Sequence, residues 1–437
     1  MEYDLIVIGA GPAGYTAALK AQREGLAVAL VEKAELGGVC LNEGCIPTKT
    51  LLREAKKAKM QAVKADDTLL EGIYQTKNAI VSRLKSGLQI LFKTGKIECI
   101  KGEAEFLCNN AIKVGEQTFS AKYFLIATGA KPGLPPISGI EHALTSTQIL
   151  AGEYKLPATL AIIGGGVIGV ELGSFFATLG SEVTIFEALP RILTTFSGDA
   201  GKYAAMLMRR QGINIITNAK VAKIEKSDNK YLLEVGEKTK EYDLVIVAVG
   251  RVPNLPKGLQ EAGVLLEKGG IVAPGIATST KGIYAVGDVV TGNAQLAHYA
   301  AFQASRAIDL ICNKIDSFTA PPVPQVVYLD TEIASVGLTE LAAAEQGYKI
   351  LVGKASTAAN GKSLIEEKGI GYYKSIFDKA THKLLGAEIV AHNAGELVGG
   401  IGALISMGVT LEGLLNTCWP HPTVSEGFYQ SCENISF

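Results

Sequence analysis

The chain has 437 residues, which is too long for one ordinary hydrophobic core, so we expect two to four domains. It is 48% hydrophobic and 19% charged, with 49 glycines, which is typical of a globular protein and excludes an intrinsically disordered one. The formal net charge is -1 and no run of lysine or arginine occurs, which argues against a nucleic-acid-binding surface.

The cysteines and the N-terminal sequence indicate the compartment. The seven cysteines are odd in number and scattered, whereas a secreted disulfide scaffold is shorter and denser in cysteine. We therefore expect a reducing compartment, the cytoplasm. The chain enters an apolar strand at Tyr3, which predicts that no signal or transit peptide is present. The apolar segment 160–180 is long enough for a membrane helix, but its glycines and Glu171 argue against one.

The N-terminal segment has the pattern of a strand, a glycine turn, a helix and a second strand. An apolar run after Asp4 leads into G-x-G-x-x-G, formed by Gly9, Gly11 and Gly14, and the second run ends at Glu32. In dinucleotide-binding folds the three glycines serve a sharp turn, the approach of a pyrophosphate and close helix–strand packing. The terminal glutamate accepts hydrogen bonds from ribose hydroxyls. The segment therefore predicts a dinucleotide site.

The stretch GGVCLNEGCIPTK holds Cys40 and Cys45, followed by Pro47 and Lys49. On an unbroken helix, residues five apart have Cα atoms about 8.7 Å apart, whereas a disulfide requires about 7 Å or less. A bridge therefore requires a distorted helix or one that starts late, and Pro47 suits the first position of such a helix. Cys45 would then precede the helix, where the dipole favours a thiolate. A structural disulfide, a metal site and a redox pair remain open, and the sequence favours the redox pair.

The strand–turn–helix–strand pattern is repeated 155 positions later, from Thr159. The repeated residues are Gly164, Gly166, Gly169 and Glu187. Two copies, each with a glutamate 18 residues past the third glycine, predict two sites for different dinucleotides. A carboxylate at Glu187 would repel a 2′-phosphate, which favours NAD over NADP, although Arg191 is a mild signal in the other direction.

Three further segments outside the two repeats have the pattern of an apolar strand followed by a turn. Tyr123–Pro132 and Asp243–Asn254 resemble each other, because each is an apolar strand that ends in a glycine turn, at Gly129 and Gly250. They are predicted to close the two nucleotide domains. In GIYAVGDVV, Asp288 follows a strand, where it could bind a ribityl or ribose hydroxyl or could instead cap a helix.

The C-terminal stretch CWPHPTVSEGF places His421 five residues before Glu426. A carboxylate that orients a histidine fixes its tautomer and makes it a better proton acceptor. By itself the stretch favours a packed histidine with an unrelated surface glutamate.

Taken together, these motifs resemble those of the flavoprotein pyridine nucleotide–disulfide oxidoreductases over essentially the whole chain. The most specific are GGVCLNEGCIPTK, GVIGVELGS, GIYAVGDVV, VPQVVYLDTEIASVGLT and HPTVSE. The resemblance implies an α/β fold with two Rossmann-like nucleotide-binding domains, for FAD and NAD, and a C-terminal α+β dimerisation domain. The expected segments are an FAD domain at 1–142, an NAD domain at 143–268, a central segment at 269–318 that completes the FAD domain, and an interface domain at 319–437.

The resemblance also implies roles for individual residues. Cys40 is expected to be the outer thiol that exchanges with substrate, and Cys45 the inner thiol against the flavin. Lys49 is expected by the flavin, with Glu171 as its partner. The expected FAD residues are Gly9, Gly11, Gly14, Glu32, Lys49, Gly129, Asp288 and Ala297, and the expected NAD residues are Gly164, Gly166, Gly169, Glu187 and Gly250. His298, next to Ala297, is expected either to start a helix near the flavin or to serve packing.

The expected partner contacts follow from the same resemblance. His421 and Glu426 are expected to serve the cysteines of a second subunit, so the protein should be a homodimer. The motifs are most similar to those of members that oxidise dihydrolipoamide on the lipoyl-bearing carrier domain of a 2-oxo acid dehydrogenase complex or a glycine-cleavage system. No metal is expected.

The chain departs from this pattern at Trp419, which replaces a second histidine and is expected to change the channel lining rather than the chemistry. One alternative is another NAD(P)H-dependent disulfide reductase that acts on glutathione or a related thiol, and another is a nucleotide-binding or interaction protein with an idle cysteine pair. The NADPH-dependent members usually carry arginines just past the second strand, where this chain has Glu187 and the two residues after it. The remaining cysteines match no ligand or redox spacing and are interpreted as small hydrophobic residues. They are Cys99, Cys108, Cys312, Cys418 and Cys432.

Overall fold

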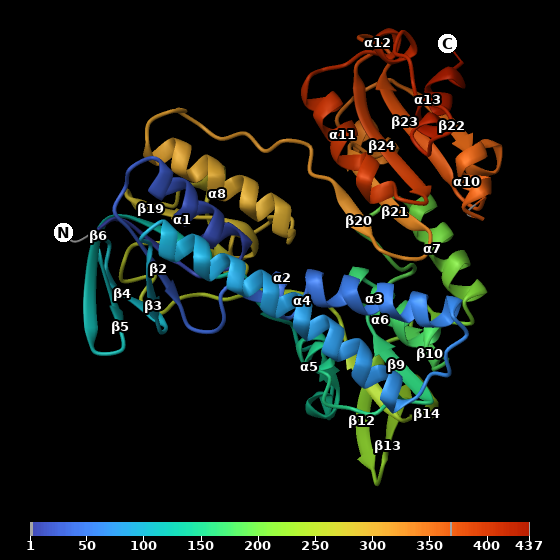
Figure 1. Cartoon of the computed structure of the whole chain (residues 1–437), viewed down its shortest axis with the longest axis horizontal. Helices are drawn as coiled ribbons and strands as arrows, with labels where there is room; N and C mark the ends of the chain where they lie inside the picture. The colour runs from blue at the N-terminus through green and yellow to red at the C-terminus, as the bar shows by residue number, and fades with distance from the viewer. Residues whose placement is uncertain (1–2, 368, 437) are drawn as a thin grey trace. The chain divides into compact units, whose positions relative to one another are not determined.

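The computed structural model describes residues 3–367 and 369–436. It forms two compact units, each composed of two separate stretches of the chain (Figure 1). Unit 1 joins Met1–Pro157 to Leu244–Thr319, and unit 2 joins Ala158–Asp243 to Ala320–Phe437.

Unit 1 contains a parallel sheet and several short strands outside that sheet. Its strands are β1 (Tyr3–Ile8), β2 (Val28–Glu32), β3 (Glu98–Lys101), β4 (Ala104–Cys108), β5 (Ala111–Val114), β6 (Gln117–Ile126), β7 (Ala130–Pro132), β8 (Leu144–Thr145), β15 (Leu244–Val247), β16 (Arg251–Pro253), β17 (Leu266–Glu267), β18 (Gly270–Ile271) and β19 (Ile283–Ala285). Its helices are α1 (Pro12–Arg23), α2 (Gly38–Asn42), α3 (Cys45–Met60), α4 (Asp67–Thr94), α5 (Ser146–Ala151) and α8 (Ala297–Ile311). The parallel order is β3-β2-β1-β6, with β19 also paired to β6.

The central strand β1 is apolar at successive positions because both faces of its sheet are covered. Leu5 packs in a cluster with α1 and α8, which lie side by side (Figure 1), and Ile6 packs in the cluster on the opposite face. Alternate residues of a strand point to opposite faces, so each of these side chains meets a different layer. An ion pair of 2.6 Å between Lys20 and Asp309 also joins α1 to α8.

Unit 2 contains the second glycine motif and the C-terminal domain. Its strands are β9 (Thr159–Ile163), β10 (Glu182–Phe186), β11 (Asn214–Ile216), β12 (Val221–Ser227), β13 (Lys230–Val235), β14 (Lys238–Tyr242), β20 (Gln325–Val327), β21 (Glu332–Gly337), β22 (Ile350–Ser356), β23 (Tyr372–Asp378) and β24 (Leu384–Ala391). Its helices are α6 (Val167–Thr178), α7 (Gly198–Arg210), α9 (Glu340–Glu345), α10 (Gly361–Ile365), α11 (Ala394–Ser406), α12 (Leu411–Leu415) and α13 (Glu426–Glu433). Strands β11-β10-β9 are parallel, β12-β13-β14 form an antiparallel sheet, and β20-β21-β24-β23-β22 form another.

The five-stranded antiparallel sheet of unit 2 is buried on both faces in its central strands. On one face, Tyr373 and Phe377 of β23 pack in a cluster with residues of α11 and α13. The alternate residues Tyr372 and Lys374 point to the other face, toward the start of α7. The predicted strand–turn–helix–strand units are confirmed for both glycine motifs, as β1–α1–β2 and β9–α6–β10.

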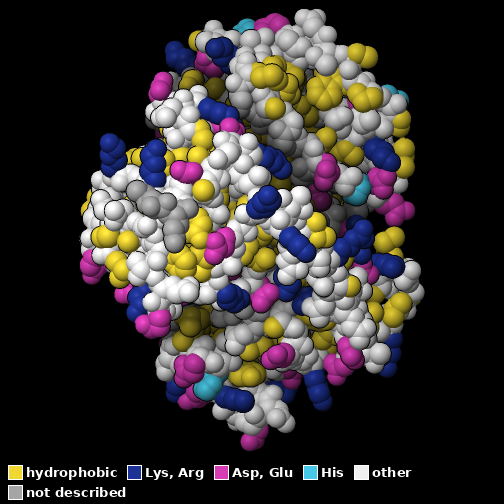
Figure 2. All heavy atoms as spheres, turned by 60° about the vertical axis from the view of Figure 1, so that its left-hand side comes forward, with side chains coloured by type: hydrophobic (Ala, Val, Ile, Leu, Met, Phe, Trp, Pro, Cys, Tyr) yellow, Lys and Arg dark blue, Asp and Glu magenta, His cyan; other side chains and the backbone are white. Residues whose placement is uncertain are grey.

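No helix in the described ranges 3–367 and 369–436 is long and apolar enough to cross a membrane. The apolar segment 160–180 instead forms β9, the second glycine turn and α6. Figure 2 shows basic and acidic side chains interspersed over the face in view, in keeping with the net charge of -1.

Candidate redox and dinucleotide sites

The first glycine turn has the geometry that a pyrophosphate requires. Gly9 adopts φ +101°, a conformation that L side chains rarely take. A Cβ on Gly14 would lie 1.7 Å from the Gly9 oxygen, so the helix packs closely on the turn. Around Gly11 the nearest atom to such a Cβ is the Gly38 Cα at 4.0 Å, which leaves the backbone open to a ligand. The residues present therefore fit a dinucleotide.

The second turn repeats this arrangement. Gly164 adopts φ +109°, and a Cβ on Gly169 would lie 2.1 Å from the Gly164 oxygen. A Cβ on Gly166 would meet no described atom within 4 Å. The same distribution of one strained, one open and one closely packed glycine supports a second dinucleotide site.

Each turn is tied to the glutamate at the end of its second strand. Glu32 accepts a hydrogen bond of 2.7 Å from the backbone N–H of Ala10, and Glu187 accepts one of 2.7 Å from Gly165. A carboxylate has about four lone-pair positions, so these bonds fix its direction and leave acceptor capacity for ribose hydroxyls.

The two segments predicted to close the nucleotide domains pair with each other. Strands β7 and β16, which follow Gly129 and Gly250, are antiparallel. Gly133 donates its N–H to the Gly250 oxygen at 2.9 Å. Gly129 and Gly250 have φ +65° and +125°, and a Cβ at either would meet no described atom within 4 Å. Both predicted glycine turns thus present open backbone.

Asp288 and Ala297 lie on either side of a loop in unit 1. Asp288 is in a single 3₁₀ turn after β19, and burial raises the pKa of its carboxyl while the charge of Arg251 opposes that. The N-cap of α8 is Leu296, so the alternative that Asp288 caps this helix is wrong. The helix starts at Ala297, one residue before His298. The side chain of Leu296 cannot cap this helix, so the first N–H groups of the helix take their partners from elsewhere.

The helix that carries the cysteine pair is broken between its two members. Cys40 lies in α2, which ends at Asn42, and Gly44 takes φ -148° and ψ -113° before α3 begins at Cys45. The predicted distortion is confirmed. The predicted start at Pro47 is wrong, because the helix begins two residues earlier and Pro47 is its third residue. Proline is tolerated there since the first N–H groups of a helix have no intrahelical acceptor.

The cysteine helix lies against the first glycine turn. Gly37 donates its N–H to the Ala10 oxygen at 2.9 Å. A Cβ on Gly38, which has φ +58°, would be 2.6 Å from the Gly11 Cα. Only a backbone without side chains allows this approach. The structure thus brings the cysteine segment to the backbone predicted to bind the first dinucleotide.

Cys40 and Cys45 are present as thiols rather than as a disulfide. A hydrogen bond between them is the main cause that raises the pKa of Cys40, burial adds to it, and the charge of Lys49 opposes it. Burial also raises the pKa of Tyr15, with further contributions from both cysteines. The thiols are therefore close enough to interact, as the redox prediction requires.

A group of residues that the sequence motifs do not include lies around the loop between the cysteines. The hydroxyl of Thr147, in α5, donates to the carboxylate of Glu43 at 2.9 Å. Arg251 is largely buried, which lowers the pKa of its guanidinium, and the charges of Asp288, Glu43 and Cys45 raise it. Glu43, which lies between the two cysteines, was the only signal in the sequence, because Thr147 and Arg251 lie 104 and 208 positions away from it.

Replacing Glu43 by glutamine should favour the thiolate of the reduced pair. Removing a negative charge beside the thiols stabilises their anionic form and leaves Arg251 less neutralised. We expect the long-wavelength thiolate–flavin absorption of the reduced holoenzyme to titrate about half a pH unit lower. Thr147→Val should disturb the same titration, whereas Thr147→Ser, which keeps the hydroxyl, should not. An unchanged midpoint in Glu43→Gln would show that Glu43 does not influence the pair.

Glu171 is only 3% exposed, in α6 of unit 2. Its carboxylate accepts the backbone N–H of Tyr328 at 3.0 Å, which gives the buried charge a partner. Lys49 lies in α3 of unit 1. Their predicted pairing would join the two units and stays a prediction.

His421 and Glu426 are in direct contact at the start of α13. The Nδ1 atom of His421 is 2.9 Å from Oε1 of Glu426, and Oε2 accepts the Thr423 N–H at 2.8 Å. The Thr423 bond, followed by the contact with His421, lowers the pKa of Glu426. An ionised Glu426 favours the proton on Nδ1, which leaves Nε2 as an acceptor. The imidazole is 78% exposed in the single chain, so the alternative of a packed histidine is wrong.

The remaining predictions concern Trp419, the other cysteines and a metal site. Trp419 packs against Phe428 and Tyr429 of α13. The interpretation of the remaining cysteines as small hydrophobic residues is wrong for Cys99 and Cys418, which are exposed. In the part of the chain that the structure describes, no group of three or more His, Cys, Asp or Glu side chains could hold a metal ion.

Two dinucleotide-type turns, with a pair of interacting thiols against the first, define a redox enzyme of the nucleotide-dependent disulfide class. Residues 3–304 match the family model of the pyridine nucleotide-disulphide oxidoreductases, and residues 323–432 match the dimerisation domain of that family. The chain belongs to the pyridine nucleotide-disulphide oxidoreductase family, and it is an oxidoreductase. The expected α/β fold with a C-terminal dimerisation domain is confirmed.

Similar proteins cover nearly the whole chain. A dihydrolipoyl dehydrogenase of Chlorobaculum parvum is 37% identical over 97% of this chain and 95% of its own length. One of Thermus scotoductus is 38% identical over 99% and 97%. Among solved structures, the HOCl-induced flavoprotein disulfide reductase RclA from Escherichia coli has a TM-score of 0.90 and 30% identity, with 99% of each chain covered.

Proposed function

We propose that this protein is a dihydrolipoyl dehydrogenase, which oxidises protein-bound dihydrolipoamide through Cys40 and Cys45 and passes the electron pair by way of FAD to NAD. The observation that carries the proposal is the position of the cysteine helix: it is broken so that the two thiols interact, and it lies against the first glycine turn. The full-length similarity to dihydrolipoyl dehydrogenases supports the substrate.

The proposed thiol exchange starts from the disulfide form of the pair. Nε2 of His421, on the partner subunit, takes a proton from one substrate thiol, and the thiolate attacks the sulfur of Cys40. The Cys40–Cys45 bond breaks and Cys45 leaves as a thiolate. The second substrate thiol then attacks the substrate sulfur of the mixed disulfide, and its proton passes to the Cys40 sulfur that leaves. Lipoamide is released and the protein pair holds two electrons.

FAD, when bound, accepts this electron pair and supplies a hydride to NAD. Gly9, Gly11, Gly14 and Glu32 would hold its adenosine and pyrophosphate, and Asp288 and the start of α8 would hold its ribityl and flavin end. Cys45 would lie against the flavin, beside Lys49 with Glu171 as its partner. The second turn and Glu187 would hold NAD. The supporting observation is the fit of both glycine turns to a pyrophosphate.

The proposal extends to assembly and location. The dimerisation-domain match supports a homodimer, in which the exposed His421 is available to a second subunit. The lipoyl group would be delivered by the carrier domain of a 2-oxo acid dehydrogenase complex or a glycine-cleavage system, in the cytoplasm. The proposed segments are 1–142 and 269–318 for FAD, 143–268 for NAD and 319–437 for the interface.

A second candidate is a disulfide reductase with another thiol substrate, favoured by the likeness to RclA and by Trp419 in place of a histidine. Assays of free dihydrolipoamide and of glutathione, with the same holoenzyme, separate the two. Oxidation of dihydrolipoamide with NAD supports the proposal. Reduction of glutathione disulfide without turnover of lipoamide would refute it.

The enzyme should prefer NAD over NADP by at least about tenfold in kcat/KM. The carboxylate of Glu187 would repel a 2′-phosphate, and Arg191, the residue that could attract one, donates to carbonyl oxygens of its own loop. Initial rates with each nucleotide at saturating dihydrolipoamide measure the ratio. A tenfold preference for NADP would overturn this interpretation of Glu187.

A further inference from the structure

Arg191 is held by the loop that follows strand β10 of the second glycine motif. Its guanidinium donates to four backbone oxygens between residues 193 and 197. Residues 191–197 are called the 191–197 loop. The donor–acceptor distances are 2.9 Å to Leu193, 3.1 Å to Thr194, 2.9 Å to Phe196 and 3.3 Å to Ser197. A guanidinium has five N–H donors, so these bonds use most of its capacity.

The same loop supports the second glycine turn. Leu193 donates its N–H to the Gly165 oxygen at 2.9 Å, and Gly165 in turn donates to Glu187. Leu193 has φ +49°, a left-handed conformation that a leucine adopts only when its surroundings impose it. The bond from Arg191 to the Leu193 oxygen helps to impose it. The 191–197 loop is therefore joined to Glu187 through Gly165.

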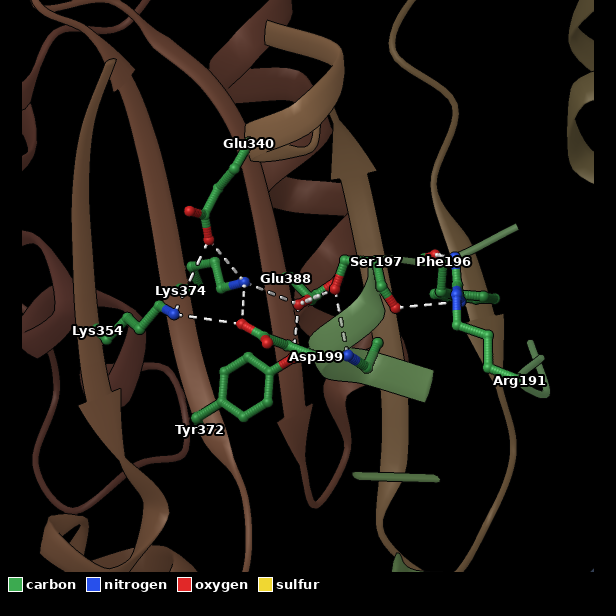
Figure 3. A network of polar contacts seen from close by, with 10 residues as sticks. Arg191, Phe196, Ser197, Asp199, Glu340, Lys354, Tyr372, Lys374 and Glu388 are labelled. Atoms are coloured by element: carbon green, nitrogen blue, oxygen red, sulfur yellow. Dashed lines mark hydrogen bonds and ion pairs between the residues drawn. The ribbon is translucent and has the colours of Figure 1, made fainter. Parts of the chain in front are cut away.

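The far end of the loop is joined to the antiparallel sheet of unit 2. Ser197 caps α7 by accepting the Ala200 N–H, and its hydroxyl donates to Glu388 of β24 at 2.8 Å. Asp199, in the first turn of α7, is 2.9 Å from the ammonium of Lys374 in β23. Figure 3 shows the ammonium of Lys374 joined by dashed lines to Asp199 and Glu388, with Arg191 on the other side of Ser197.

Lys374 and Glu388 form a cross-strand pair, in register and 3.3 Å apart, with side chains that are 3% and 4% exposed. Lys374 also contacts Glu340 at 2.9 Å, and Tyr372 donates to Glu388. Burial lowers the pKa of Lys374, but the charge of Glu388 and the bonds to Asp199 and Glu340 outweigh it, and the net shift is upward. A charged pair that is buried with several partners tolerates little change in geometry.

We propose that Arg191, Ser197 and the Lys374–Glu388 pair are positioning residues of the second nucleotide site, which hold the 191–197 loop and through it Gly165 and Glu187 in the conformation that binds NAD. The C-terminal domain thereby contributes to nucleotide affinity within its own subunit. The inference rests on the proposed function only in taking NAD as the nucleotide of this site.

The competing role for Arg191 is direct contact with a 2′-phosphate, and the two roles predict opposite patterns. A positioning arginine affects NAD and NADP alike, whereas a phosphate ligand affects NADP alone. A positioning role for Ser197 further requires that the hydroxyl rather than the residue itself matters, because only the hydroxyl reaches Glu388.

Isothermal titration of NAD⁺ and NADP⁺ into the oxidised holoenzyme tests the proposal without lipoamide. We expect Ser197→Ala and Arg191→Gln to weaken NAD⁺ binding about tenfold, the size of one lost hydrogen bond to a charged group. Ser197→Thr should restore binding to within about twofold of the wild type. Lys354→Gln removes an exposed cation that contacts Asp199 at 3.2 Å and is the matched control, which should change little.

The outcomes are separable. Unchanged NAD⁺ affinity in Ser197→Ala, or an Arg191→Gln variant that loses affinity for NADP⁺ alone, overturns the proposal. Lys374→Met should also weaken NAD⁺ binding. If this variant does not fold, the comparison of Ser197→Ala with Ser197→Thr still tests the proposal. Failure of the wild type to oxidise dihydrolipoamide would refute the proposed function and leave the nucleotide-binding result standing.

Discussion

Cys45→Ser should lower the rate of dihydrolipoamide oxidation by about a thousandfold or more, while FAD stays bound. Serine has nearly the size of cysteine but forms no disulfide, so Cys40 loses the partner that must leave when substrate attacks. The glycine turn and Glu32, which would hold FAD, do not depend on this sulfur. Steady-state assays with NAD and the flavin absorption of the purified variant provide the two measurements.

The same variant should lack the long-wavelength band that a thiolate gives beside a flavin. Cys99→Ser is the matched control, because Cys99 is an exposed cysteine of the same unit, in strand β3 rather than in the helices of the pair. It should keep both turnover and the band. Turnover retained in Cys45→Ser would refute the redox role of the pair.

His421→Gln should slow the half-reaction with dihydrolipoamide by about a hundredfold to ten-thousandfold, the usual range for loss of a general base. Reduction of the flavin by NADH should change far less, because that half-reaction requires no proton transfer from a substrate thiol. Glutamine keeps a similar size and can still accept one hydrogen bond, but it does not accept a proton at neutral pH. Stopped-flow absorbance of each half-reaction separates the two effects.

The control for His421 is a second histidine–glutamate contact in the same domain. His382 contacts Glu412 through Nδ1 as His421 contacts Glu426. His382→Gln should leave both half-reactions within about twofold of the wild type, since surface substitutions away from a site have small effects. Equal slowing of both half-reactions in His421→Gln would mean that this histidine has a structural role.

The acid side of the pH profile should follow from the same contact. Because the pKa of Glu426 is lowered, this carboxylate stays ionised at pH values where an ordinary glutamate begins to take up a proton. It therefore continues to orient His421 as the pH falls. The loss of dihydrolipoamide oxidation in acid should then not follow the protonation of Glu426, and Glu426→Gln should lower the rate at all pH values.

The sequence by itself determined the features that depend on a few neighbouring residues. The positive φ of Gly9 and Gly164, the close helix packing at Gly14 and Gly169, and the contacts of Glu32 and Glu187 with their turns all follow from spacing that repeats along the chain. A glycine acts on the conformation of its own turn, so a motif of eleven to thirty residues carries that information. The break near Cys45 was predictable for the same reason, although its position was not.

Only the tertiary structure decided which distant groups meet. The contact of Thr147 with Glu43 had no signature in the sequence. The contacts of Arg191 are local along the chain, but by its residue type Arg191 pointed toward NADP, whereas the structure engages it with its own loop. The Lys374–Glu388 pair and its contact with Ser197 link residues 191 positions apart. A buried polar group takes whichever partner the packing of sheets and helices brings within about 3 Å, and that choice is set by the whole fold rather than by its neighbours in the chain.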